Sequence, residues 1–387
     1  MATPNTSFGA DLKVVQICHD YEGPFQAICQ QYNAAFENAH VTTLYLRGKP
    51  NEDVAARTGG NEVVFLDQGE GSLSGIKWTT IFRVYRLFSR SSFDVAIAHR
   101  YKSIYLAGLM SYFFNLNLVL AVAHEHKVFK RITRSLFLTF WRKQIVVLGV
   151  SESVTRDVES NCPGLKSQGR LYTLNNAIDI NQKARLKSRN EARAQLGLDP
   201  NDFLFGTVGR LVVKKNHTLM LNAFARSAVP NDAKLLLIGS GPEEMKLRKL
   251  AQELGLGNQL VFLGHVTDAY RYLPALDVFV FSSGEAEAFG VVLLEAMLAE
   301  TPVISSNASG PAEVVRDTGW LFDLDSVNDL SRMISKIASM SEHDRRARTA
   351  SALARVETEY SGERFRHNFW RLKPMMELRQ LKRVSRS

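Results

Sequence analysis

The feature that most constrains the fold is an alternation of short apolar runs with longer amphipathic segments. In the first half, the apolar runs are separated by stretches such as Phe25–Phe36, whose apolar residues recur at helical spacing. Short runs of this kind are typical of buried strands. The strands expected here are Lys13–Ile17, Val41–Leu46, Asp94–Ala98, Leu118–Val122 and Gln144–Val150. Strands that alternate with helices predict a parallel sheet covered by helices on both faces.

The second half repeats this scheme after a polar stretch, Ile180–Pro200, where the domain boundary is expected. Its expected strands are Phe203–Val208, Lys234–Ile238, Leu260–Leu263, Val278–Phe281 and Pro302–Ser305. A chain of 387 residues is also long enough for two α/β domains. We therefore expect one domain over residues 1–185, a second over 186–355, and a basic helical tail over 356–387 that packs back toward the first.

Composition narrows the class of protein. Hydrophobic content of 45% and charged content of 22% are typical of a globular protein, and no apolar run is long enough to span a membrane. The polar start, Met1–Ala10, predicts no secretory signal. Cys18, Cys29 and Cys162 show no metal-ligand spacing and cannot all pair, so reduced thiols in a cytoplasmic protein are expected.

The net charge of +9 is unevenly distributed along the chain. Residues 1–185 carry 21 Lys and Arg against 15 Asp and Glu, whereas residues 186–363 carry 19 against 23. Residues 364–387 carry 8 against 1. The first half and the tail are therefore positively charged. A surface of this charge is suited to contact an anionic membrane or an anionic acceptor.

The most informative segment is Ser282–Met297, which follows the expected strand Val278–Phe281. Ligands of parallel sheets bind at the carboxyl ends of the strands, against helix N-termini. Glu287 lies in the turn, Gly290 allows a ligand close to the backbone, and Glu295 follows within the helix. Two carboxylates can hold a sugar and a ribose, while the amides of Phe289, Gly290 and Val291 hold phosphate. Alternatively, both glutamates are solvated residues at a helix N-terminus, where acids are favoured.

A second segment, Gly209–Asn216, follows the expected strand Phe203–Val208. Arg210 offers a planar fork of donors for phosphate oxygens, and Lys215 offers a compact charge. Two such cations can neutralise a nucleoside-diphosphate leaving group without a metal ion. Taken alone, either residue could be part of a basic surface turn.

Together these segments resemble the donor-binding domain of glycosyltransferase family 4, a retaining family with the GT-B fold. Gly209–Lys215 fits the family's Gly-Arg-Leu-x₃-Lys pattern, and Glu287 with Glu295 fits its glutamate pair. Gly239–Pro242 and Gly310–Val315 follow in the family's order. The resemblance covers about residues 147–322. It implies an α/β chain of two Rossmann-like, doubly wound domains that face a deep cleft, where a nucleotide-diphosphate sugar binds.

The first half resembles the family more loosely. His99, at the end of the strand Asp94–Ala98, matches a histidine that points at the donor sugar in the family, although a lone histidine after a strand is more often structural. Relatives carry a Gly-Gly loop over the diphosphate, where this chain has only Gly23.

The resemblance implies retention at the anomeric carbon, with no enzymatic nucleophile and no metal or other cofactor. The expected catalytic residues are His99, Arg210, Lys215 and Glu287. The expected substrate-binding residues are Gly23, Gly209, Arg210, Lys215, Glu287, Ala288, Phe289, Gly290, Val291 and Glu295. Arg210, Lys215 and the helix amides would stabilise the departing diphosphate, Glu287 would hold the sugar, and Glu295 the ribose.

The acceptor is expected to be a glycan or glycolipid of the bacterial envelope, such as a lipopolysaccharide core. Lys127–Lys143 interleaves six basic residues with Phe129, Phe137, Phe140 and Trp141, and Trp78–Phe93 is a second aromatic and basic stretch. Such segments suit peripheral contact with an anionic membrane on its cytoplasmic side. They fit an amphipathic core helix with a solvated basic face equally well.

Two other functions remain open. A sequence pI near 9.4 suggests a nucleic-acid-binding protein, but the basic regions are separate and no nucleic-acid motif occurs. A non-catalytic nucleotide-sugar-binding subunit is also compatible with the motifs. The intact set Arg210, Lys215, Glu287 and Glu295 favours the enzyme.

Overall fold

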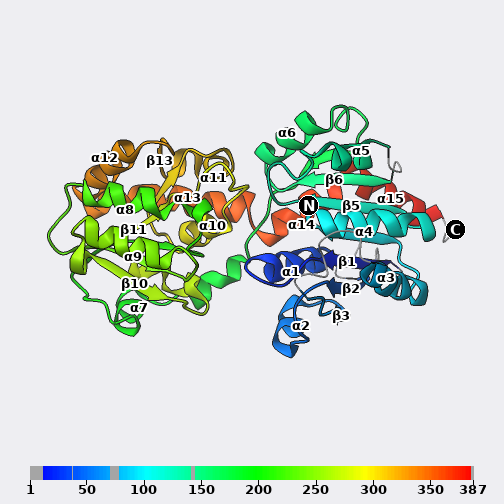
Figure 1. The fold of residues 1–387 in the computed structure, drawn as a ribbon, viewed down its shortest axis with the longest axis horizontal. Helices are drawn as coiled ribbons and strands as arrows, with labels where there is room; N and C mark the ends of the chain where they lie inside the picture. Colours follow the sequence, from blue (N-terminus) through cyan, green and yellow to red (C-terminus); the bar gives the residue numbers. More distant parts are fainter. Residues whose placement is uncertain (1–11, 37, 70–77, 141–143, 385–387) are drawn as a thin grey trace. The chain divides into compact units, whose positions relative to one another are not determined.

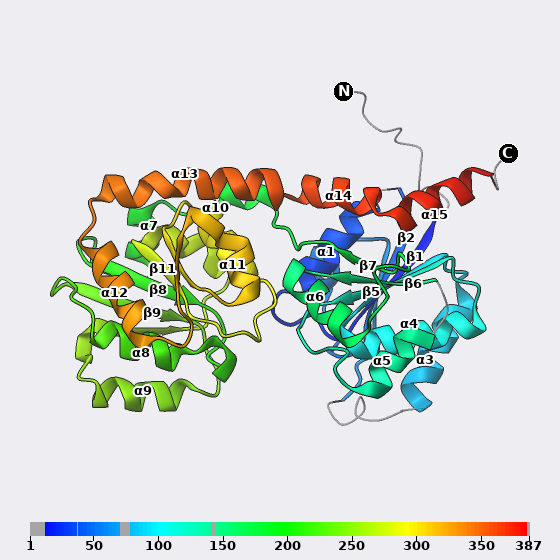
Figure 2. The same ribbon diagram turned by 90° about the horizontal axis from the view of Figure 1, so that it is seen from above.

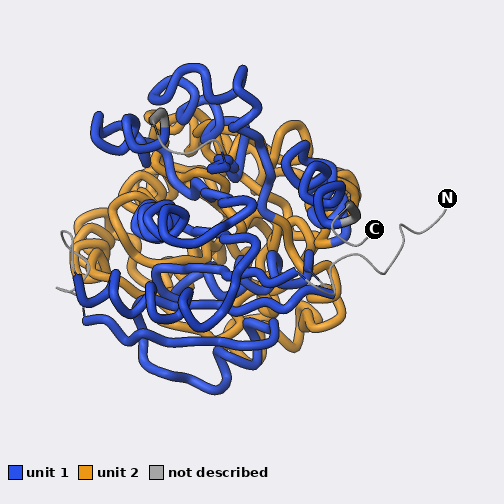
Figure 3. The backbone as a smooth tube through the Cα atoms, turned by 90° about the vertical axis from the view of Figure 1, so that its right-hand side faces the viewer, with its two compact units in different colours: residues 1–176, 363–387 blue, residues 177–362 orange. Residues whose placement is uncertain are grey.

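The computed structural model describes residues 12–36, 38–69, 78–140 and 144–384. These residues form two compact units, one comprising residues 1–176 and 363–387 and the other residues 177–362 (Figures 1 and 3). Each unit contains one parallel sheet with helices on both faces. Two Rossmann-like domains were predicted from the alternating pattern, and this fold class is confirmed.

In the first unit, the described residues form a seven-stranded parallel sheet of order β3-β2-β1-β4-β5-β6-β7. The strands are β1 (Lys13–Cys18), β2 (His40–Tyr45), β3 (Glu62–Phe65), β4 (Val95–His99), β5 (Leu118–Ala123), β6 (Ile145–Gly149) and β7 (Leu171–Thr173). The central strands β4, β5 and β6 are buried along their whole length, which explains their continuous apolar sequences. Because all strands run parallel, their carboxyl ends meet at one edge of the sheet.

Helices cover both faces of this sheet. Figure 2 shows α3, α4 and α5 on one face, with α1, α14 and α15 on the other. The bounds are α1 (Phe25–Ala35), α2 (Glu52–Thr58), α3 (Trp78–Arg90), α4 (Arg100–Phe113), α5 (Ile132–Phe140), α6 (Glu152–Asn161), α14 (Gly362–Arg371) and α15 (Lys373–Val384). The last two helices belong here because Trp370 donates a hydrogen bond to the Ala35 carbonyl, and Lys382 Nζ lies 2.6 Å from an Asp94 oxygen.

The second unit has a six-stranded parallel sheet among its described residues, in the order β10-β9-β8-β11-β12-β13. The strands are β8 (Phe203–Val208), β9 (Ala233–Ile238), β10 (Leu260–Gly264), β11 (Val278–Phe281), β12 (Val303–Ser306) and β13 (Trp320–Phe322). Apolar side chains of these strands form the core with those of α8 (His217–Ala225) and α12 (Val327–Ala338). This order makes β8 and β11 neighbours, so the segments that follow them lie side by side.

The remaining helices of the second unit are arranged in two layers. Figure 2 shows α8, α9 and α12 on one face of the sheet, and α10, α11 and α13 on the other. Their bounds are α7 (Arg189–Gln195), α9 (Glu244–Glu253), α10 (Val291–Leu298), α11 (Ser309–Val315) and α13 (Glu342–Glu359), with short 3₁₀ turns η2 (Ile180–Arg185), η3 (Val213–Lys215), η4 (Gly257–Gln259), η5 (Ala269–Ala275) and η6 (Arg316–Thr318).

The units divide at 176/177 and 362/363, whereas the sequence suggested 185/186 and 355/356. Residues 177–185 belong to the second unit because they contact other residues of that unit. Lys183 Nζ lies 2.9 Å from a Glu300 carboxylate oxygen, and the Arg271 guanidinium donates to the Arg185 carbonyl. At the second division, Ile178 donates its amide hydrogen to the Tyr360 carbonyl, which keeps residues 356–362 in the second unit.

Candidate functional site

The segment after β8 carries Arg210 and Lys215 at the carboxyl edge of the second sheet. Gly209 donates its amide hydrogen to Ile238, and a side chain at Gly239 would meet the Gly209 carbonyl at 1.9 Å, so the loops after β8 and β9 pack backbone to backbone. Arg210 is exposed, and its guanidinium has no hydrogen-bond or ion-pair partner among the described residues. Lys215 ends the 3₁₀ turn η3.

Lys215 and Glu287 are directly paired. The Lys215 ammonium lies 2.7 Å from Glu287 Oε2 and 4.8 Å from the centre of the Phe281 ring. Both side chains are largely buried. Burial raises the pKa of Glu287, but the charge and hydrogen bond of Lys215 outweigh it, and the net pKa lies below the usual value. The carboxylate is therefore ionised at neutral pH.

The turn between β11 and α10 is fixed by backbone hydrogen bonds. Gly284 donates to the Lys214 carbonyl, and Glu287 donates to the Gly284 carbonyl. Gly290 has φ of +89° at the start of α10, a conformation that favours glycine. Among the described residues, the amides of Phe289, Gly290 and Val291 donate no hydrogen bond. Three unengaged amides at this helix start are suited to an anion.

Two further residues of this turn have their side chains buried. Ala288 lies close to Gly310, at which a side chain would meet the Ala288 carbonyl at 2.4 Å. The Phe289 ring packs edge-on against Tyr360, with 5.7 Å between ring centres. Their contribution to a ligand site is therefore through the backbone.

Glu295 lies in the second turn of α10, on the helix that follows Glu287, and is only partly exposed. Among the described residues its carboxylate makes no hydrogen bond or ion pair. Burial raises the pKa of Glu295 to about 7. A carboxyl group in this state lacks the donors that would stabilise its charge, and ligand hydroxyls can supply them.

The structure thus brings Lys215 and Glu287 into contact, and it places the free amides and Glu295 on the turn and helix that follow. Arg210 lies on the neighbouring segment with its guanidinium unpaired. Together these residues offer positive charge and amide donors for phosphate, and carboxylate acceptors for hydroxyl groups.

His99 in the first unit is fully buried, and both of its ring nitrogens are engaged. Nε2 lies 2.7 Å from Gln16 Oε1, and Nδ1 lies 2.9 Å from His124 Nε2. Burial lowers the pKa of His99 to about 3, so the ring is neutral. The amide oxygen of Gln16 can only accept, which places the His99 proton on Nε2. His99 Nδ1 then accepts a hydrogen bond from His124.

His99 therefore offers no free nitrogen to a ligand, which revises its sequence-based assignment as a direct sugar contact. His124 is the partly exposed ring of the pair, directly after β5, and His99 fixes its tautomer. Among the described residues, His124 Nδ1 has no hydrogen-bonding partner. His124 was not predicted from the sequence, although its position close to the end of the expected strand Leu118–Val122 was the signal that could have found it.

Gly23 lies in an exposed turn after β1 and has φ of +60°. Nothing lies within 4 Å of the position that a side chain on it would take. The turn is thus open.

No group of three or more His, Cys, Asp and Glu residues in the described part of the chain could hold a metal ion. The thiols of Cys18, Cys29 and Cys162 are free and buried. No helix within the described ranges has the length and apolar character needed to cross a membrane.

The aromatic residues of Lys127–Lys143 are mainly core residues where they are described. Phe129 and Phe137 are buried, so these two side chains are not available for the membrane contact expected of this segment. Trp141 and the Phe140 side chain lie outside the described residues. The second aromatic and basic stretch, Trp78–Phe93, does have exposed aromatic side chains. Trp78 and Phe82 of α3 are 78% and 59% exposed. Ile132 of α5 is 73% exposed.

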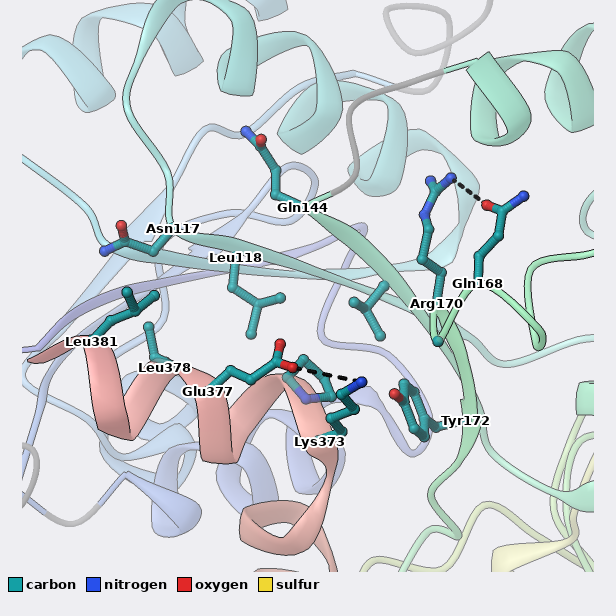
Figure 4. A pocket seen from close by; sticks show the side chains of 13 residues that line it. Asn117, Leu118, Gln144, Gln168, Arg170, Tyr172, Lys373, Glu377, Leu378 and Leu381 are labelled. Atoms are coloured by element: carbon teal, nitrogen blue, oxygen red, sulfur yellow. Dashed lines mark hydrogen bonds and ion pairs between the residues drawn. The ribbon is translucent and has the colours of Figure 1, made fainter.

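A cavity of about 460 Å³ lies at the opposite, amino-terminal edge of the first sheet (Figure 4). Leu118 and Val146 line it from the sheet, and α15 contributes Lys373 and Glu377, which lie 3.8 Å apart. No sequence-predicted site residue lines this cavity, so it is distinct from the site at the carboxyl edge.

Comparison with known proteins relates the second unit to an enzyme family. Residues 188–353 match the family described as "Glycosyl transferases group 1". The chain is 34% identical over 149 residues to the lipopolysaccharide core biosynthesis glycosyltransferase LpsE of Rhizobium meliloti, covering 38% of this chain and 43% of that protein. It is 29% identical over 181 residues to the N-acetyl-alpha-D-glucosaminyl L-malate synthase of Bacillus anthracis, covering 46% of each. The chain thus matches less than half the length of either relative.

Solved structures resemble the chain over most of its length. The Anabaena protein Alr3699/HepE in complex with UDP-glucose has a TM-score of 0.78 at 19% identity, covering 92% of this chain and 98% of that one. The sucrose-phosphate synthase of Thermosynechococcus elongatus has a TM-score of 0.76 at 20% identity, covering 97% and 100%. At these identities the likeness concerns the fold, which is the GT-B fold of glycosyltransferases.

Proposed function

We propose that the protein is a retaining glycosyltransferase that transfers a sugar, of the hexosyl type, from a nucleotide-diphosphate sugar to a hydroxyl group of a glycan or glycolipid. The similarity to the lipopolysaccharide core glycosyltransferase LpsE favours an acceptor of bacterial envelope polysaccharide or lipopolysaccharide synthesis. We propose further that no metal ion takes part. Supporting the proposal are the family match of the second unit and the arrangement of its Lys215 and Glu287.

The observation that carries the proposal is the Lys215–Glu287 pair beside three unengaged amides. Lys215 and the amides of Phe289–Val291 can meet the negative charge of a diphosphate, and the unpaired Arg210 adds a bidentate donor. Because this charge grows as the bond to the sugar breaks, fixed donors stabilise the transition state more than the ground state.

The two glutamates have different tasks in this mechanism. Glu287 accepts hydrogen bonds from the transferred sugar, whose ring becomes positively charged in the transition state. Glu295 accepts hydrogen bonds from the ribose, which does not change during the reaction. The leaving phosphate oxygen takes the proton of the acceptor hydroxyl, which enters from the same face of the sugar. The configuration at the anomeric carbon is thereby retained.

We propose that the first unit binds the acceptor substrate. His124 offers its Nδ1 as an acceptor to a hydroxyl group, and His99 with Gln16 holds the ring in the required tautomer. The open turn at Gly23 leaves backbone accessible to a ligand.

We propose that the protein works in the cytoplasm, attached peripherally to the inner face of an anionic membrane. Exposed Trp78 and Phe82 share α3 with Arg83, Arg86 and Arg90, and the described part of this helix has no acidic residue. Apolar side chains among cations suit an interface with anionic lipid.

A thermal-shift panel of UDP- and GDP-sugars tests the donor. At least one should raise the melting temperature of the wild type, because a ligand that binds only the folded state stabilises it. Release of nucleoside diphosphate from that sugar then distinguishes an enzyme from a non-catalytic binding subunit. No response to any member would contradict a nucleotide-sugar donor.

A further inference from the structure

Three cations gather at the carboxyl edge of the first sheet, around His19. The strand order β2-β1-β4 places the residues that follow these strands next to one another. Arg47 donates its amide hydrogen to the His19 carbonyl at 2.9 Å, directly after β2 and β1. Arg100 follows β4, and Lys102 lies in the first turn of α4. The residues come from separate parts of the chain and meet because of the fold.

Arg100 is held in a costly conformation. Its φ of +69° lies in the left-handed region, which is unusual for a residue with a side chain. The guanidinium lies 3.5 Å from Asp20, 3.0 Å from Glu125 and 4.7 Å from the centre of the Phe25 ring. Backbone strain of this kind persists where the surroundings impose it, and it is concentrated at functional sites.

Lys102 is the cation without a counter-charge. Among the described residues it has no hydrogen-bond or ion-pair partner. Partial burial, followed by the charges of Arg47 and Arg100, lowers its pKa. Burial also lowers the pKa of His19 to about 4, so its imidazole is neutral at pH 7 and can donate or accept a hydrogen bond. Like charges brought together in this way repel each other, and a bound anion would remove the repulsion.

We propose that Arg47, Arg100 and Lys102 form an anion subsite that holds a phosphate or carboxylate group of the acceptor. Identifying the ligand as the acceptor rests on the proposed function. The donor diphosphate is the other possible source of an anion, but the second unit already provides Arg210, Lys215 and three free amides for it. The subsite thus favours acceptors that carry a negatively charged group.

The test is a calorimetric titration of the full chain with glucose 6-phosphate and glucuronate, with glucose as the uncharged probe. The nucleotide that the thermal-shift panel identifies is present at saturation, so that the donor site is filled. Wild type should bind at least one charged probe saturably and bind glucose much more weakly. Lys102→Gln should weaken that binding about tenfold through loss of a charge-assisted contact, and Lys102→Arg should largely retain it. Lys249, an exposed lysine of α9, supplies the matched control, Lys249→Gln, which should bind as wild type does.

Three results would overturn the proposal. One is the absence of saturable binding of both charged probes by wild type. Another is equal affinity of wild type and Lys102→Gln. The third is a Lys102→Gln variant that loses affinity for the nucleotide sugar, which would assign the subsite to the donor. If no nucleotide binds at all, the proposed function fails, while the titration without nucleotide still reports on the anion subsite.

Discussion

The ammonium of Lys215 lies 2.7 Å from Glu287 Oε2, in a part of the second unit where both side chains are largely buried. In the absence of ligand, the cation proposed for the diphosphate and the carboxylate proposed for the sugar therefore neutralise each other. Burial raises the pKa of Glu287, but the charge and hydrogen bond of Lys215 lower it below the usual value and keep the carboxylate ionised. To replace this ion pair, a bound donor has to bring a negatively charged group to Lys215 and a hydroxyl-bearing group to Glu287.

The two glutamates should respond differently to substitution. Glu287→Gln should lower kcat about 100-fold, because the proposed mechanism places Glu287 against the sugar, where charge develops in the transition state. Glu295→Gln should raise KM for the donor about tenfold with little change in kcat, because the ribose is unchanged by the reaction. Steady-state kinetics with varied donor measure both values. Small and equal effects of both substitutions would contradict these roles. They would indicate instead that both glutamates are solvated residues near a helix N-terminus.

Donor affinity should increase with pH around neutrality. The pKa of Glu295 is about 7, and the ionised carboxylate is the better acceptor for ribose hydroxyls. If only that form binds, affinity should rise about tenfold between pH 6 and pH 8. Calorimetric titration at both values measures this change. It should be absent in Glu295→Gln, and an equal rise in that variant would assign the effect to another group.

The same carboxyl group should affect stability with the opposite sign. In the unfolded chain Glu295 ionises near its ordinary pKa of 4.5, whereas in the folded protein it ionises near 7. Its contribution to the free energy of unfolding is therefore complete below pH 4.5 and is lost as pH rises to 7. Urea unfolding at pH 5 and pH 8 should show a larger decrease for wild type than for Glu295→Gln.

Transfer activity should survive chelation. In the proposed mechanism, Lys215, Arg210 and the amides of Phe289–Val291 provide the positive charge that a metal ion would otherwise supply to the leaving group. Activity measured before and after dialysis against EDTA should agree within about twofold. If activity is lost and manganese or magnesium restores it, the metal-independent mechanism is contradicted.

Membrane attachment should depend on α3 and on salt. We expect the protein to co-sediment with anionic vesicles at low ionic strength and less at high ionic strength, because each basic residue at such a surface contributes about 1 kcal/mol. Phe82→Ser should weaken binding, whereas Met245→Ser, at an exposed position of the second unit, should not. Equal binding to neutral vesicles, or none to anionic ones at low salt, would contradict the proposal.

The central strands were predictable because burial on both faces leaves continuous apolar runs. Val278–Phe281 and Phe203–Val208 were predicted with the bounds that the structure has. The outer strands β3, β7 and β13 were missed, since three or four residues at or near a sheet edge carry little periodic signal. The division between the units was misplaced because residues 177–185 make their contacts with residues far along the chain, such as Lys183 with Glu300 and Arg185 with Arg271.

The candidate site was predictable where one segment carries the whole pattern. Glu287, Gly290 and Glu295 share one turn and helix, so their spacing was informative. His99 was misjudged because its partners Gln16 and His124 come from other strands, and only the fold shows that they occupy both ring nitrogens. The cations Arg47, Arg100 and Lys102 are likewise brought together by strand order, which single segments do not reveal.

The most direct test of the account is the rate of nucleoside-diphosphate release from the nucleotide sugar that binds, with wild type, Lys215→Ala and Lys214→Ala compared. Lys214 is the exposed neighbour of Lys215 and serves as the matched control. We expect Lys215→Ala to slow nucleoside-diphosphate release about 100-fold or more, whereas the release rate of Lys214→Ala should stay within about threefold of wild type. Circular dichroism would verify that both variants fold. A folded Lys215→Ala variant that turns over at the wild-type rate would contradict the proposed site.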